Sequence, residues 1–109
     1  MSDAFHDREK GFERKFQLDQ EQEFRAQSRR DKLFGQWAAS QLGRTGIAAE
    51  TYATAVVDSN FEKPGDEDML GKVRADFQLA NVDMDGINLN TKLQEFYALA
   101  AKQISDEKK

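Results

Sequence analysis

A chain of 109 residues can form one domain with a modest core, but it is short for an enzyme with a deep pocket. Its net charge of −4 is not the basic balance that is typical of a dedicated nucleic-acid-binding protein. It contains no cysteine, so disulfides and thiolate metal sites are excluded, which fits a reducing cytosol. No signal-peptide pattern and no run of about twenty apolar residues is present, so we expect a soluble protein without direct membrane insertion.

Residues 1–18 form a charge-dense arm with a narrow aromatic stripe. Phe5, Phe12 and Phe16 fall on one side of a helix at about 100° per residue. The polar run 17–23 that follows offers these rings little apolar surface to pack against. The rings either complete the core of the body or face a partner protein, and the polar run favours the second interpretation. A mid-helix glycine, Gly11, costs about 1 kcal/mol relative to alanine, so we expect a flexible or projecting helical arm that becomes ordered on its partner.

Residues 19–109 are predicted to form the body, beginning with two helices. The first extends from about Asp19 to Leu42, where Gly43 suits a helix end. The second extends from about Ile47 to Asn60. The apolar positions of the first helix are Phe24, Leu33, Phe34, Trp37, Ala38 and Leu42.

Two further helices complete the predicted body. The third follows a turn at 63–68, whose carboxylates suit the positive end of a helix dipole, and extends through Phe77. The fourth is expected after a cap at Asp85 and extends through Ile104, followed by a loose tail from Asp106. No segment alternates like a strand, so we predict an all-α fold, a small four-helix bundle.

The search for catalytic or metal-binding chemistry is mostly negative. His6 is the only histidine, so a Ser-His arrangement or a histidine metal site is not supported. The acidic cluster 66–68 fits a helix N-terminus without a metal, and the segment 83–86 lacks the later ligands of a calcium loop. The basic stretch 25–32 is interpreted as a solvated face, or secondly as a protein-docking surface, with nucleic acid third. We therefore expect no enzyme activity, no catalytic residue and no metal site.

Four blocks of sequence, taken in order, carry a resemblance to a known family: 7–16, 29–39, 65–68 and 72–76. Together they resemble the zeta subunit of alphaproteobacterial F-type ATP synthases, an F1-ATPase inhibitor family. The resemblance implies a four-helix bundle whose N-terminal helix inserts into a catalytic α/β interface of F1 near the γ stalk and blocks rotary ATP hydrolysis. It also implies a cytoplasmic protein that is peripheral to the inner membrane through F1.

By this resemblance the arm binds the α, β and γ subunits of F1-ATPase, with its aromatic rings as anchors and its charges at the rim. No cofactor is expected, although some members of the family bind adenine nucleotides weakly. The alternative function is a small helical regulatory protein that binds an adenine nucleotide without strong inhibition. The predicted partner-binding residues are Phe5, Asp7, Arg8, Glu9, Lys10, Phe12, Glu13, Arg14, Lys15 and Phe16.

Overall fold

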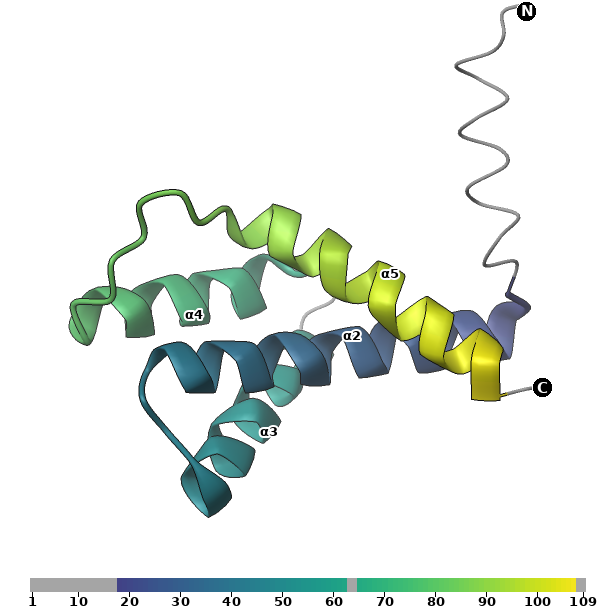
Figure 1. The fold of residues 1–109 in the computed structure, drawn as a ribbon, viewed down its shortest axis with the longest axis horizontal. Helices are drawn as coiled ribbons and strands as arrows, with labels where there is room; N and C mark the ends of the chain where they lie inside the picture. The colour runs from purple at the N-terminus through teal and green to yellow at the C-terminus, as the bar shows by residue number, and fades with distance from the viewer. Residues whose placement is uncertain (1–17, 63–64, 108–109) are drawn as a thin grey trace, which may run out of the picture.

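The computed structural model describes residues 18–62 and 65–107, which form four α-helices and no strand (Figure 1). This part of the chain confirms the all-α, four-helix prediction; the arm lies outside it. None of its helices has the length and hydrophobicity needed to cross a membrane. The helices are α2 (Gln20–Gln41), α3 (Gly46–Glu62), α4 (Glu67–Leu79) and α5 (Leu89–Glu107).

Helix α2 lies at the centre, with α3 against one side and α5 against the other (Figure 1). On the α3 side, Gly35 lets the two backbones approach closely, because a Cβ atom there would lie 2.9 Å from the Cα of Ala53. On the α5 side, Trp37 contacts Phe96. Helix α4 packs against α3, and α5 returns along α2 in the opposite direction.

Local capping interactions set the helix ends, and one of the predicted ends was wrong. The α2 end at Gly43 is confirmed: this residue has φ +77°, and the amide of Arg44 donates to the carbonyl of Ala39 at 2.9 Å, as in a Schellman motif. Asp85 does not cap α5. Asn88 does so instead, because its side-chain oxygen accepts from the amide nitrogen of Thr91 at 3.1 Å.

The core lies where all four helices meet, and Trp37 is at its edge. The indole is partly buried, with ring centroids 5.8 Å from Phe34, 5.7 Å from Phe77 and 6.3 Å from Phe96. It therefore joins α2 to α4 and α5. The largest fully buried side chains are Phe34, Phe77, Met69, Ile104, Val56 and Val73.

We predict that Trp37→Ala destabilises the body without involvement of any partner. A loss of about 3 kcal/mol is expected, at the low end of the range for large aromatic side chains, because Trp37 is only partly buried. For a domain of this size that corresponds to a melting temperature lower by roughly 12 °C or more. Thermal melts followed by circular dichroism measure the change, and Gln36→Ala on the neighbouring exposed position serves as the control. A melt within a few degrees of wild type would contradict the prediction.

Candidate functional site

The ten predicted partner-binding residues, Phe5 to Phe16, all lie in the arm, outside the residues that the structure describes. The proposed division at residues 18 and 19 likewise remains a prediction. The structure does define the end of the body to which the arm is joined, and the surfaces that the body exposes.

The junction between arm and body is a capped helix start. Asp19 has extended backbone angles, φ −77° and ψ 177°, and its side chain accepts from the amide of Gln22 at 2.8 Å. The side chain of Gln22 in turn accepts from the amide of Asp19 at 3.1 Å, which completes a capping box. Helix α2 therefore begins at Gln20 and does not continue back through Leu18.

Beside this junction, the first turns of α2 are held to the last turn of α5 by ion pairs. Arg25 and Arg29 both contact Glu107, and Arg29 also reaches Gln103 at 3.4 Å. The hydrogen bond from Arg29 lowers the pKa of the Glu107 carboxyl. The prediction of a loose tail from Asp106 was wrong for Asp106 and Glu107, which belong to the last turn of α5.

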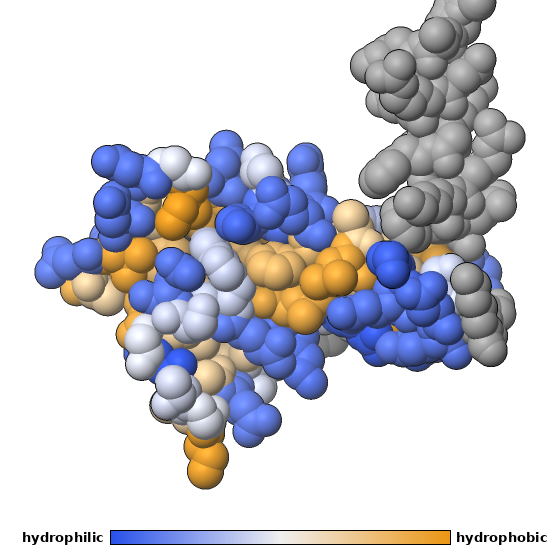
Figure 2. All heavy atoms as spheres, in the orientation of Figure 1, coloured by the Kyte–Doolittle hydropathy of each residue, from blue (hydrophilic) through white to orange (hydrophobic). Residues whose placement is uncertain are grey.

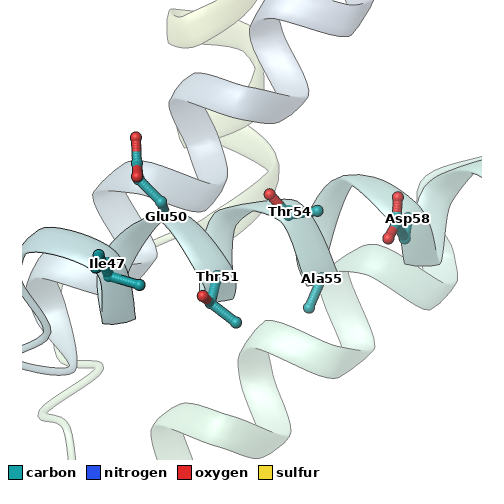
Figure 3. Close-up of a pocket in the computed structure, with 6 residues that line it drawn as sticks. All are labelled: Ile47, Glu50, Thr51, Thr54, Ala55 and Asp58. Atoms are coloured by element: carbon teal, nitrogen blue, oxygen red, sulfur yellow. The ribbon is translucent and has the colours of Figure 1, made fainter.

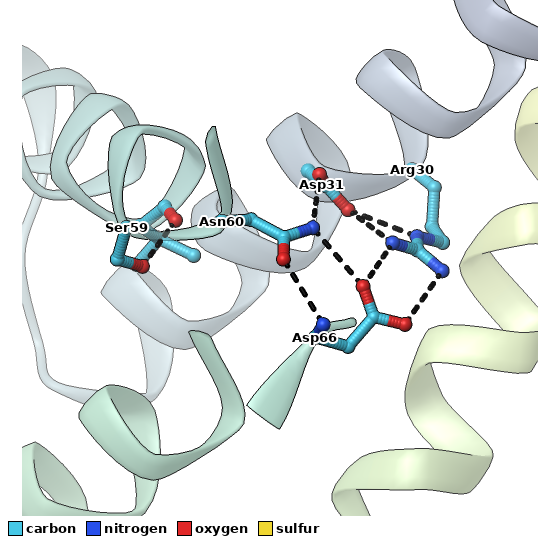
Figure 4. Close-up of polar contacts among 6 residues, drawn as sticks. Arg30, Asp31, Ser59, Asn60 and Asp66 are labelled. Atoms are coloured by element: carbon cyan, nitrogen blue, oxygen red, sulfur yellow. Dashed lines mark hydrogen bonds and ion pairs between the residues drawn. The ribbon is translucent and has the colours of Figure 1, made fainter. Parts of the chain in front are cut away.

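A second polar cluster joins the middle of α2 to the connection between α3 and α4 (Figure 4). Arg30 lies 2.8 Å from carboxylate oxygens of both Asp31 and Asp66. The Asn60 side-chain amide donates to both carboxylates at 2.9 and 3.0 Å, and its oxygen accepts from the amide of Asp66 at 3.1 Å. Burial lowers the pKa of Arg30, but the hydrogen bonds and charges of the two aspartates outweigh it, so the net pKa is raised.

The ion pairs of these two clusters change the interpretation of two sequence features. The predicted basic face at 25–32 is largely compensated by carboxylates within the chain, which does not favour nucleic-acid phosphates as its ligand. Of the three carboxylates at 66–68, Glu67 and Asp68 lie in the first turn of α4 as predicted. Asp66 precedes that turn in a left-handed conformation, φ +72°, and makes no side-chain cap, because it binds Arg30.

A third cluster surrounds the buried ring of Tyr52 in α3. Its hydroxyl donates to a carboxylate oxygen of Asp76 at 2.7 Å, and Lys72 lies 3.1 Å from the same oxygen. Burial and this hydrogen bond raise the pKa of Tyr52. Arg44 and Lys72 lie 4.9 and 5.1 Å from the ring centre, which favours cation–π contact. Since Asp76 partners both the hydroxyl and a lysine, the cluster serves to fix α3 to α4.

Two surface features remain, a depression on α3 and an apolar patch over α5. An open depression follows the outer face of α3, and the six residues that line it all come from this one helix (Figure 3): Ile47, Glu50, Thr51, Thr54, Ala55 and Asp58. On the opposite side of α2, apolar side chains gather over α5 and the adjoining part of α2 (Figure 2). Neither feature brings together an acid, a base and a nucleophile.

The described part of the chain contains no group of three or more side chains arranged to hold a metal ion. In the segment 83–86, which lacks the later ligands of a calcium loop, the side chain of Asp83 accepts from the amide of Asp85 at 2.9 Å, as in an Asx turn.

Sequence reasoning missed two features at the arm end of the body. Phe24 was counted among the apolar positions of the first helix, but its side chain is 62% exposed. Glu107 was expected in a loose tail but pairs with two arginines that precede it by 82 and 78 residues. No local sequence pattern indicates the exposure of Phe24 or the ion pairs of Glu107, because both features depend on where α3 and α5 end relative to α2.

Comparison with known families gives one match over most of the chain. The model of the family ATPase inhibitor subunit zeta matches residues 1–103, which include the arm and nearly all of the body. A search of curated proteins gives no match.

Proposed function

The chain belongs to the ATPase inhibitor subunit zeta family, and on this premise we propose that its arm, residues 1–18, inserts into a catalytic α/β interface of F1-ATPase near the γ stalk. The inserted arm blocks rotary ATP hydrolysis. The observation that carries this proposal is the family match itself, since it spans the arm and the body together. An inhibitor subunit of this kind binds an ATPase and is not itself an enzyme.

The proposed mechanism is the removal of a conformational step. Rotary hydrolysis requires each catalytic interface to open and close, so a helix wedged in that interface stops turnover without taking part in the chemistry. Ordering the arm on its partner has an entropic cost. Burial of Phe5, Phe12 and Phe16, at about 1.5 to 3 kcal/mol for each fully buried ring, would offset that cost. The charged side chains on either side of the stripe set the register of the helix at the rim.

The body acts in this proposal as a rigid carrier for the arm. The capping box sets the start of α2 at Gln20, so this helix does not extend back through Leu18. The ion pairs of Arg25 and Arg29 with Glu107 join the first turns of α2 to the last turn of α5. The arm is therefore attached to a helix end that contacts α5.

The test is a titration of the cognate F1-ATPase with the full chain. We expect ATP hydrolysis to fall in proportion to the protein added and to reach its minimum near one inhibitor per ATPase. Unchanged hydrolysis at a large excess of the protein would refute the proposal. If adenine nucleotide then shifted NMR signals of the body alone, the nucleotide-binding alternative would replace it.

A further inference from the structure

Phe24 is a large aromatic side chain that the fold leaves uncovered. It lies two turns before Asp31 on the same side of α2, the side against which α3 packs. Asn60, near the end of α3, already contacts Asp31. Helix α3 therefore ends before it reaches Phe24, whose side chain is 62% exposed.

The backbone that carries Phe24 is nevertheless held in a helix. The capping box at Asp19 sets the start of α2, and Phe24 lies in the second turn after it. Binding would therefore order only the side chain of Phe24 and not its backbone, which lowers the entropic cost of burying this ring. Its neighbours one helical turn away are polar: Gln20, Gln27 and Ser28 are uncharged, and Glu21 is charged. An aromatic centre with a polar border is the arrangement typical of an interface hot spot.

Chain length places this end of the body next to the partner. Gln20, the first helical residue of α2, is only four positions after Phe16, the last aromatic ring of the arm. Four residues span at most about 14 Å when fully extended. Phe24 lies about 6 Å further along the helix. If Phe16 is held in the ATPase, the first turns of α2 must lie at the mouth of the site that receives the arm.

We propose that Phe24 is a second anchor on the same ATPase, outside the arm. It would enter an apolar depression with a polar border at the mouth of the arm's binding site. The inference rests on the proposed function, because it takes the position of the arm from it. It extends the contact surface from the arm to the end of the body.

Two matched variants of the full chain test this inference. Phe24→Ala removes the proposed anchor, whereas Leu79→Ala removes an apolar side chain that is 84% exposed and lies in the last turn of α4, outside the arm end of the body. We expect Phe24→Ala to raise the concentration needed for half-inhibition about tenfold, or about 1.4 kcal/mol. Leu79→Ala should stay within about twofold of wild type, and both variants should melt within a few degrees of it, because neither side chain is buried.

Hydrogen exchange on the complex gives an independent readout. The amides around Phe24 should gain protection when the ATPase binds, and those around Leu79 should not. Equal potency of Phe24→Ala and wild type, or unchanged exchange around Phe24, would overturn the inference while leaving the proposed function intact. Greater potency of Phe24→Ala would show that Phe24 holds the arm back on the body, which also overturns it. If wild type does not inhibit at all, the proposed function and this inference fail together.

Discussion

Removal of residues 1–18 is expected to abolish inhibition while the remaining body still unfolds cooperatively. The buried hydrophobic residues in the described part of the chain lie between Ala26 and Ile104, and α2 begins with its own cap at Asp19. A chain that starts at Asp19 therefore keeps this core and the side chains of the capping box. Circular dichroism should show a melting temperature within a few degrees of wild type. In the ATPase titration, potency should fall by more than about a hundredfold, or about 2.7 kcal/mol, because the aromatic anchors are gone.

The matched control is a chain that lacks residues 1–4, which removes none of the ten proposed contact residues and should inhibit like wild type. Loss of cooperative melting in the longer truncation would mean that the aromatic stripe belongs to the core. Full inhibition by the body alone would instead place the inhibitory surface on α2 to α5.

The helices of the body could be predicted because their signals are local. Apolar side chains repeat at helical spacing in each of them, and Gly43 ends α2 through a left-handed conformation that glycine adopts without strain. The predicted cap of α5 at Asp85 was wrong, and the structure has Asn88 in that role. Aspartate and asparagine cap helices about equally well, so residue type alone does not choose between the two positions.

The polar contacts that fix the helices to one another could not be predicted in this way. Arg30 and Asp66 are 36 residues apart, and Arg29 and Glu107 are 78 apart. Such pairs follow from the packing of α3 and α5 on α2, which no short window of sequence encodes. The exposure of Phe24 has the same origin, since helical periodicity gives the side of a helix but not the point at which its neighbour ends. The arm is a different case, because its assignment as the inhibitory segment comes from its aromatic stripe and from the family resemblance, and not from the packing of the helices.

The double substitution Phe12→Ala with Phe16→Ala is expected to weaken inhibition far more than the loss of any single charge in the arm. The two residues are one helical turn apart, about 6 Å along the axis, so both rings can enter one groove. Loss of two buried rings should reduce potency by at least about a hundredfold. An exposed ion pair contributes only about 0 to 1 kcal/mol, so Lys10→Ala or Lys15→Ala should reduce potency less than about sixfold.

Salt concentration and thermal stability separate the possible explanations of this result. If the aromatic rings dominate, the potency of the double variant should stay low from low to high ionic strength, because apolar burial is not screened by salt. Its melting temperature should match that of wild type if the arm lies outside the packed body. Suppose instead that the double variant inhibits as wild type does, while Lys10→Ala or Lys15→Ala loses potency and added salt weakens the wild-type protein. Recognition would then be electrostatic, and the aromatic-anchor mechanism would be wrong even though the inhibitor family assignment stands.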